Sequence, residues 1–292
     1  MKLDQARGTF LGLAVGDALG CTLEFSKRNA EMPRHEEISG GGPFKVAAGD
    51  HTDDTCMALA LASSLVEKSE FDPVHVMDEF LEWYINGKYS PTNKCIDIGN
   101  TVRAALDRWK NDRYSPFCGP QGEFSSGNGG IMRLCPIIIW HRYSYENALT
   151  DAVVQSMLTH ASNNCIRYSQ IFASILWRGS VDKNIISGLD TLALPDNEAW
   201  PAATGDVMSS LKAAVWAVRT TSNFRDAVIK AVNLGDDSDT VGAITGQIAG
   251  RIYGAKNIPK NWLRILTARE EITELATALF KKAPKTMKGE LK

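Results

Sequence analysis

Several features that would assign this chain to a particular protein class are missing from its sequence. No run of about 18 apolar residues occurs, so we expect no membrane-spanning helix and no membrane partner. The first residues lack the basic region, the apolar region and the small-residue cleavage site of a secretory signal peptide. We therefore predict a cytoplasmic, water-soluble protein.

The cysteines and the charges argue against further classes. Six cysteines lie far apart, without a Cys-x-x-Cys or paired-histidine motif, so we expect neither a zinc site nor a disulfide framework, but reduced and mostly buried thiols. A formal net charge of -2 carries no electrostatic signature of nucleic-acid binding. We interpret the basic end of the chain, from about residue 283, as a frayed, solvated tail. The lysines near this end are Lys281, Lys282, Lys285, Lys288 and Lys292.

Helical periodicity dominates the chain, because apolar residues recur at steps of three and four while sustained two-residue alternation is nearly absent. We predict an all-α fold in a single domain, 1–292, since no loop has the composition of a linker. Asp72, Ser144 and Asn223 are expected to cap helices. The predicted helices lie at roughly 4–24, 54–68, 73–86, 99–110, 129–141, 146–159, 163–178, 205–220, 224–233, 239–253 and 260–281.

The string Gly-Asp-His-Thr-Asp-Asp-Thr at 49–55 ends a glycine-rich loop and opens into an apolar helical run. Adjacent aspartates at a helix start can cap free N–H groups and lie favourably in the helix dipole. Thr52, Asp53 and Asp54 also offer three hard oxygen ligands within one turn, which suit Mg²⁺, Mn²⁺ or Ca²⁺. This motif alone leaves capping and metal binding both open.

The same pattern recurs far along the chain as Gly-Asp-Asp-Ser-Asp-Thr at 235–240, again before an apolar helix. If the two motifs met in the core without a cation, their carboxylates would repel each other strongly. A shared polynuclear metal site would resolve this conflict, because two bridged metals activate water and orient substrate oxygens. Neither loop has the spacing or the closing Glu of an EF-hand.

The first predicted helix carries Gly16, Asp17 and Gly20 in an otherwise apolar run. Glycine inside a helix costs about 1 kcal/mol relative to alanine unless close packing or a ligand requires it. Glu24 ends this stretch, where a carboxylate is electrostatically disfavoured, so we expect it either to face a cation or to lie exposed on the surface.

A small-residue loop, Ser-Ser-Gly-Asn-Gly-Gly at 125–130, leads into another predicted helix. Its unobstructed N–H groups could cradle an anion, although it lacks the Gly-Lys-Ser/Thr of a P-loop and such a turn is more often only a turn.

The string Asp-Ile-Gly-Asn-Thr at 97–101 can cap the helix that follows it. His160 is a single histidine of the kind that is usually structural.

Taken in this order, the motifs resemble those of the ADP-ribosylglycohydrolase family, which includes dinitrogenase-reductase-activating glycohydrolases and ADP-ribosyl-acceptor hydrolases. Each string is weak alone, but six in register over residues 8–254 are specific. Two positions depart from the family pattern, since His51 replaces an aromatic or aliphatic residue and Asp236 replaces a glycine. The matching strings are GLAVGDALG at 12–20 with Glu24, TDDT at 52–55, DIGNT at 97–101, GNGG at 127–130, TH at 159–160 and DSDT at 237–240.

The resemblance implies an all-α orthogonal bundle with a dinuclear Mg²⁺ or Mn²⁺ site in a central cleft. Asp239 would bridge the two cations, and Glu24 would lie beside them. The implied metal ligands are Thr52, Asp53, Asp54, Asp237, Asp239 and Thr240. The implied substrate-binding residues, of which the loop at 125–130 would hold a pyrophosphate, are Ser125, Ser126, Gly127, Asn128, Gly129, Gly130, His160 and Asn100.

The DIGNT string and the chain length resemble the arginine-specific, dinitrogenase-reductase-activating type. We therefore expect hydrolysis of the N-glycosidic bond of ADP-ribosyl-arginine, with an ADP-ribosylated protein as substrate and ADP-ribose as product. Asp97 would manage a proton or hold the guanidinium, because a carboxylate accepts its planar fork in a bidentate pair. The implied catalytic set is Asp97, Glu24, Asp54 and Asp239.

Two other functions stay open at this point. Hard metals and an anion loop do not by themselves specify a glycosidic bond, so the substrate could be O-linked ADP-ribose or another nucleotide or phosphorylated small molecule. A protein without catalysis could mask modified targets, or act as an immunity partner of an ADP-ribosyltransferase counterpart. The presence of all six implied ligands argues against a silent protein.

Overall fold

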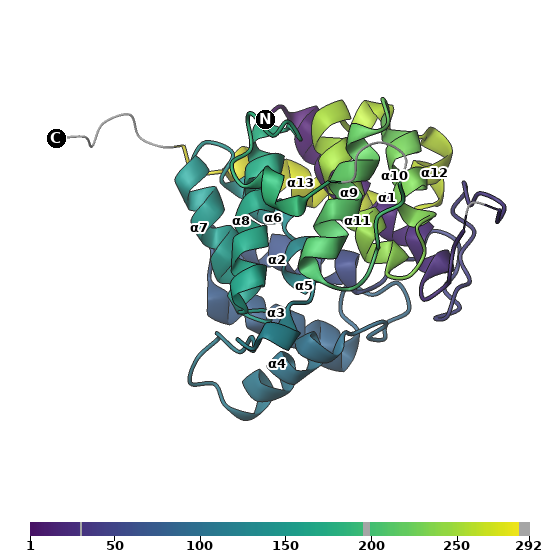
Figure 1. The fold of residues 1–292 in the computed structure, drawn as a ribbon. Helices are drawn as coiled ribbons and strands as arrows, with labels where there is room; N and C mark the ends of the chain where they lie inside the picture. Colours follow the sequence, from purple (N-terminus) through teal and green to yellow (C-terminus); the bar gives the residue numbers. More distant parts are fainter. Residues whose placement is uncertain (30, 195–198, 286–292) are drawn as a thin grey trace.

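The chain is built from helices (Figure 1). The computed structural model describes residues 1–29, 31–194 and 199–285, and over these ranges the only β-type pairing is three isolated β-bridges. The predicted all-α class is confirmed. The predicted tail lies largely outside the described residues, Lys288 and Lys292 included.

The elements match most of the predicted ranges. The α-helices are α1 (Leu3–Gly20), α2 (Asp53–Lys68), α3 (Pro73–Asn86), α4 (Asn100–Asn111), α5 (Gly129–Met132), α6 (Cys135–Trp140), α7 (Tyr145–Met157), α8 (Asn163–Arg178), α9 (Val207–Arg219), α10 (Phe224–Val232), α11 (Ser238–Tyr253), α12 (Lys260–Ile265) and α13 (Arg269–Lys282). The 3₁₀ helices are η1 (Cys21–Leu23), η2 (Glu123–Ser125), η3 (Leu189–Leu192) and η4 (Ala255–Asn257).

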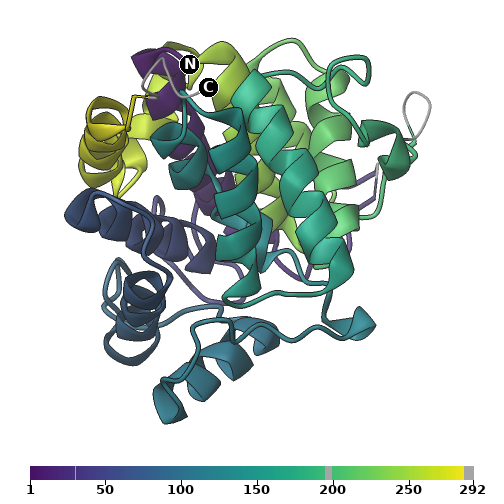
Figure 2. The same cartoon turned by 90° about the vertical axis from the view of Figure 1, so that its left-hand side faces the viewer.

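The helices pack around a central pair, α1 and α11, which make the most extensive contact between any two elements. Helix α10 packs on α11 and α9, while α13 packs on α1 and α2. Helices α7 and α8 pack against each other and stand upright on one side of the molecule (Figure 1). Helix α2 packs on α3, and α3 packs on α4; in the view turned by 90° these blue elements lie at the left and lower left of the molecule (Figure 2).

The three predicted helix caps are confirmed. The Asp72 side chain accepts hydrogen bonds from the N–H groups of Val74 and His75, and Pro73 occupies the first position of α3. Ser144 and Asn223 each accept a hydrogen bond from the backbone N–H three residues later. These short polar side chains satisfy N–H groups that the first turn of a helix leaves free.

Two predicted helices are each broken into two in the structure. The predicted helix 129–141 divides into α5 and α6 because Pro136 has no N–H to continue the ladder. Gln247 of α11 fills the break, since its side chain accepts from Cys135 N–H and donates to Met132 O. The predicted helix 260–281 divides into α12 and α13 at Thr267, whose N–H donates to Gly49 O over 3.0 Å.

Glycines form the seam between α1 and α11. The helices run antiparallel, and a Cβ added at any of these glycines would overlap the backbone of the opposite helix. Only the absence of side chains allows so close an approach, which explains why glycine is tolerated inside α1 despite its low helix propensity. The facing pairs are Gly8 with Gly250, Gly12 with Gly246 and Gly16 with Gly242, and Gly20 faces Ser238.

The structure also bears on the cysteine thiols and on the absence of membrane-spanning helices predicted above. All six cysteines are free, and all except the half-buried Cys95 are buried, as predicted. Among the described residues, no helix combines the length and the apolar character needed to cross a bilayer.

We expect Gly246→Ala to lower the free energy of unfolding by about 1–3 kcal/mol, because its methyl group would have to displace the backbone of α1. The matched control is Gly122→Ala, in an exposed loop position where a Cβ would meet only Ser125 Oγ, at 3.7 Å, and where φ is -64°. The control should change stability by less than about 0.5 kcal/mol. Urea unfolding of both variants measures the difference, and equal stabilities would contradict the role of the seam.

Candidate metal centre and substrate cleft

Asp17 of α1 caps the beginning of α2 with its side chain. Its fully buried carboxylate accepts hydrogen bonds from the backbone N–H and the hydroxyl of both Thr52 and Thr55, at distances of 2.6 to 3.2 Å. Thr52 is the N-cap of α2 and makes no cap bond with its own side chain. The capping interpretation of Asp53 and Asp54 is therefore wrong, because both lie inside the helix and a carboxylate from α1 does the capping.

Glu24 caps the beginning of α11 in the same way. The chain leaves η1 at this residue, and the carboxylate is buried against α11, where its Oε2 accepts the N–H of Ser238 over 2.9 Å. The N-cap of α11, Asp237, makes no cap bond with its own side chain. The alternative in which Glu24 lies exposed on the surface is therefore wrong.

These two arrangements bring the two Thr/Asp motifs together. Carboxylate oxygens of Asp17, Asp54 and Asp239 lie within 4.8 Å of one another, and those of Glu24, Asp237 and Asp239 form a second such group. Asp239 belongs to both groups. The threonines lie in the same place, because Thr52 Oγ1 is 3.4 Å from Asp239 Oδ2 and Thr240 Oγ1 is 3.5 Å from Asp54 Oδ2. Asp53 is in neither group and instead lines the adjoining cavity.

Burial and mutual repulsion raise the pKa values of these carboxyls. The pKa of Asp17 and that of Asp237 rise to about 7, first because of burial and then because of the negative charge of Asp239. The same two causes raise the pKa of Glu24 to about 12, and burial also raises the pKa of both aspartates that begin α2 well above their usual range. At neutral pH the centre therefore holds protons unless another positive charge replaces them.

The donor set suits a hard divalent cation. The Oδ1 atom of Asp54 is buried and has no hydrogen-bond partner, which leaves a lone carboxylate oxygen in the centre. Thr52 donates its only hydroxyl hydrogen to Asp17 over 2.9 Å, so its oxygen lone pairs are free for another contact. Carboxylate and hydroxyl oxygens are the ligands that Mg²⁺, Mn²⁺ and Ca²⁺ prefer. The residues present thus fit the kind of ion that the sequence motifs imply.

A cavity of about 290 Å³ opens beside this acidic centre. Most of the predicted substrate-binding residues contribute to its wall, whereas Ser125, Ser126 and Gly130 do not. Ser126 instead lies behind the wall, where its hydroxyl bonds that of Ser162 over 2.9 Å. The predicted site residues that line the cavity are Glu24, Asp53, Asp97, Asn100, Gly127, Asn128, Gly129, His160, Asp237 and Thr240.

The small-residue loop makes room for a histidine ring. A Cβ on Gly127 would lie 3.0 Å from His160 Nε2, and one on Gly129 would lie 2.5 Å from His160 Cε1. Asn128 between them ties the loop to α11, because its side-chain amide donates to Asp237 Oδ2 over 2.5 Å. The His160 ring thus leaves no room for a Cβ at Gly129 unless it moves, and little room for one at Gly127.

His160 is neutral and lies among buried polar neighbours. Arg133 donates to Thr159 Oγ1 over 2.7 Å, and this hydroxyl oxygen is 2.9 Å from His160 Nδ1. Burial, with the Arg133 charge as a second cause, lowers the pKa of His160 to about 3. The ring is therefore neutral at physiological pH, and its Nε2 atom faces the glycine loop.

Asp97 approaches the cavity from the loop between α3 and α4. Its backbone is in the left-handed region with φ 60°, and its half-buried side chain lines the cavity with that of Asp53. Burial, then the charges of Asp53 and Asp239, raise the pKa of Asp97 to about 11. The neighbouring carboxylates thus disfavour an isolated negative charge here and would favour a cationic partner.

The two departures from the family pattern lie at the edges of the centre. His51 is buried, and its Nε2 pairs with Tyr89 O over 3.1 Å, so it holds the beginning of the loop that carries Asp97. Asp236 is exposed, with φ 55°, and its backbone exchanges hydrogen bonds with Phe25 and Ser26 just after Glu24. Neither residue displaces a predicted ligand.

The part that Asp17 plays is not predicted from the sequence, although the residue lies within a matching motif. A signal was present, because Asp17 is the only charged residue between Arg7 and Glu24 in an apolar helical run. A charge at such a position is buried when the helix packs, and a buried charge requires partners.

Known proteins resemble this chain over nearly its whole length. The family model described as ADP-ribosylglycohydrolase matches residues 1–288. Two proteins named ADP-ribosylarginine hydrolase Tri1, from Serratia proteamaculans (strain 568) and Pseudomonas putida (strain GB-1), are 39% and 37% identical to it. Each match covers 97% of this chain, and 81% and 79% of the respective relative.

More distant relatives and solved structures agree with these matches. The ADP-ribosyl-[dinitrogen reductase] glycohydrolase of Rhodospirillum rubrum is 29% identical over 92% of both chains. A solved structure described as an ADP-ribosylglycohydrolase-related protein complex superposes with a TM-score of 0.83 and 34% sequence identity. That superposition covers 97% of this chain and 99% of the other.

We expect metal-free protein to lose stability as the pH rises from 5 to 8. The pKa of Asp17 and that of Asp237 are about 7 in the fold against an ordinary 3.8, so their protonated forms stabilise the fold at low pH and that contribution is lost as the pH passes 7. Mg²⁺ or Mn²⁺ should replace the protons, so the increase in Tm on adding metal should grow with pH. Thermal unfolding in EDTA and in excess metal tests this, and a metal-induced increase independent of pH would contradict it.

Proposed function

The chain belongs to the ADP-ribosylglycohydrolase family, and we propose that it is a metal-dependent hydrolase that removes ADP-ribose from modified arginine side chains of proteins. One observation carries the proposal. The two Thr/Asp motifs meet in a buried acidic centre, and this centre adjoins a cavity that also contains Asp97. The two relatives named ADP-ribosylarginine hydrolase support the arginine linkage.

We propose that two divalent cations, Mg²⁺ or Mn²⁺, occupy the acidic centre. The proposed ligands are Thr52, Asp53, Asp54, Asp237, Asp239 and Thr240, with Asp239 shared. Asp17 orients Thr52 and does not itself bind metal, because its oxygens are already used by four donors of α2. Bound cations of this kind supply an activated water and hold oxygens of the substrate.

The reaction replaces one bond at the anomeric carbon of the ribose. An oxygen–carbon bond from water forms, the carbon–nitrogen bond to the guanidino group breaks, and the leaving nitrogen takes up a proton. Asp97 lies in the same cavity and suits the guanidino end of the substrate, because a carboxylate accepts its fork in a bidentate pair. Glu24 completes the acidic side beside α11.

The neutral groups of the cavity wall suit the phosphates. They are Asn128, the loop glycines at 127 and 129 and the ring of His160. They add no fixed positive charge, and the Asn128 amide and the loop N–H groups are hydrogen-bond donors. We propose that the substrate lies with its arginine end at Asp97, its ribose at the acidic centre and its phosphates at these neutral groups.

We expect the purified protein, with Mg²⁺ or Mn²⁺, to release labelled ADP-ribose from an arginine-linked substrate and not from serine-linked or ester-linked ones. EDTA should abolish the release, and added metal should restore it, because no protein group replaces the cations. Thin-layer chromatography of released ADP-ribose measures all three linkages in parallel. Release from serine but not from arginine would overturn the proposed substrate.

Asp97→Asn is expected to lower kcat/KM for ADP-ribosyl-arginine about 10²-fold or more, the usual effect of losing a positioned acid–base group. Its matched control is Asp107→Asn, on α4 just beyond the same loop but outside the cavity lining, which should retain activity. Unfolding curves of both variants separate lost catalysis from lost fold. Unchanged release by Asp97→Asn would remove this residue from the mechanism.

A further inference from the structure

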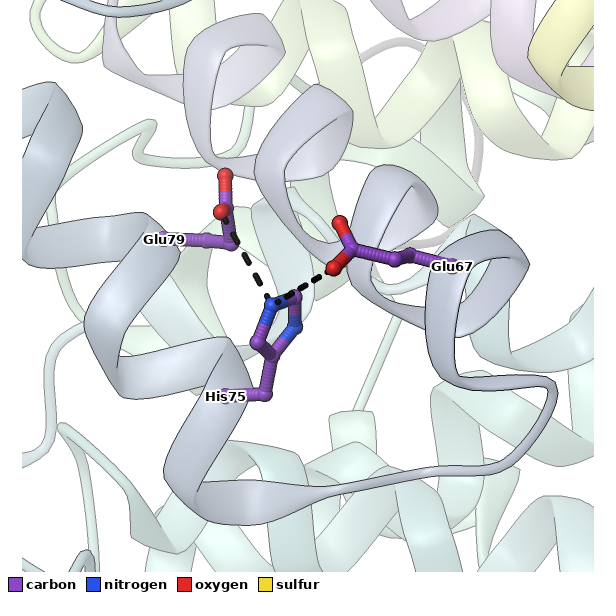
Figure 3. Close-up of side chains that lie close together, drawn as sticks. All are labelled: Glu67, His75 and Glu79. Carbon is purple, nitrogen blue, oxygen red and sulfur yellow. Dashed lines mark ion pairs between the residues drawn. The ribbon is translucent and has the colours of Figure 1, made fainter.

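Glu67, His75 and Glu79 form a separate group of side chains where α2 ends and α3 begins (Figure 3). His75 and Glu79 are one turn apart on α3, and Glu67 reaches the same point from the last turn of α2. The His75 Nε2 atom is 3.5 Å from Glu67 Oε1 and 4.0 Å from Glu79 Oε1. None of the three residues lines the cavity described above.

The imidazole ring is oriented from behind by a buried hydroxyl. His75 Nδ1 lies 2.9 Å from Ser64 Oγ, and Ser64 is fully buried in α2. When Nδ1–H donates to this hydroxyl, Nε2 carries a lone pair and points between the two carboxylates. Metal-binding histidines commonly donate their other N–H to a fixed partner of this kind, which sets the tautomer and the ring orientation.

The distances suit a bridging ion better than direct hydrogen bonds. Charge-assisted N–H···O bonds are about 2.7–2.9 Å long, so the two gaps at Nε2 are too wide for them. Nitrogen and oxygen ligands lie about 2.0–2.2 Å from a tetrahedral zinc ion, which separates two ligands by roughly 3.4 Å. Small side-chain movements would therefore bring all three ligand atoms onto one ion.

Glu79 has one carboxylate oxygen, Oε1, available for a metal ion. Its Oε2 accepts Lys88 Nζ over 2.6 Å and also the Tyr89 hydroxyl, and these bonds fix the carboxylate so that Oε1 faces the ring. The two carboxylates and the ammonium group of Lys88 together leave a net charge of about -1 for a divalent cation to meet. The exposed Glu67 gives such an ion a route from solvent.

We propose that Glu67, His75 and Glu79 bind one Zn²⁺-class ion through one nitrogen and two oxygens, with water in the fourth position. The nitrogen donor distinguishes this site from the all-oxygen acidic centre. The ion would join α2 to α3, and through Lys88 and Tyr89 it would also steady the beginning of the loop that carries Asp97. This site does not depend on the proposed hydrolase activity.

The test counts bound zinc. Protein stripped with EDTA and then kept in excess Mg²⁺ is dialysed to equilibrium against a series of Zn²⁺ concentrations, and bound zinc per chain is measured by atomic emission. Wild type is expected to bind one more zinc per chain than His75→Gln. Glu67→Gln is expected to weaken this site at least about tenfold, since one of three protein ligands loses its charge. Equal zinc binding by wild type and His75→Gln would overturn the proposal.

A matched control guards against general effects of charge and folding. Glu82→Gln removes a carboxylate from an exposed position on α3, where Glu82 pairs with Asn86, and it should bind zinc as wild type does. If His75→Gln does not fold, Glu67→Gln and Glu82→Gln decide the question, because both replace exposed side chains. Identical zinc dissociation constants for these two variants would also overturn the proposal.

Discussion

The backbone contact between α1 and α11 is the constraint on which the site depends. Gly12 and Gly16 of α1 face Gly246 and Gly242 of α11, and no other residue allows two helices to approach so closely. Because the helices are antiparallel, the end of α1 lies beside the beginning of α11. This register places the charges near the end of α1 next to the second Thr/Asp motif, although more than two hundred residues separate them in the chain.

Two carboxylates, at and just beyond the end of α1, then cap the beginnings of two other helices. Asp17 takes the free N–H groups at the start of α2, and Glu24 takes one at the start of α11. The aspartates within these motifs are thereby released from capping and can turn toward a shared centre. Both helices direct the positive ends of their dipoles at that centre, which favours negative charge there. Capping and metal binding are alternatives in the sequence, and in the structure the capping falls to Asp17 and Glu24, which leaves the aspartates of the motifs free for the metal binding that we propose.

Much of the fold follows from local sequence, whereas the site depends on contacts between distant segments. The caps at Asp72 and Ser144 need only neighbouring residues, so the sequence predicts them correctly. The break at Pro136 was also visible locally but was outweighed by the apolar periodicity around it. The break at Thr267 was not visible, because its hydrogen bond to Gly49 joins segments far apart in the chain. The role of Asp17 likewise depends on distant contacts, because its four hydrogen-bond donors come from the beginning of another helix.

The cavity is lined by carboxylates and by neutral groups, and this combination limits how it could bind a phosphate. Among the described residues that line it, there is no lysine or arginine. Arg133 lies close by, but it is fully buried, donates to Gln155 and Thr159 and does not line the cavity. A phosphate entering the cavity would therefore meet only neutral groups and carboxylates. The carboxylates would repel it unless cations offset their charge. If the acidic centre binds cations, as we propose, the charge of the cleft would make phosphate binding depend on them.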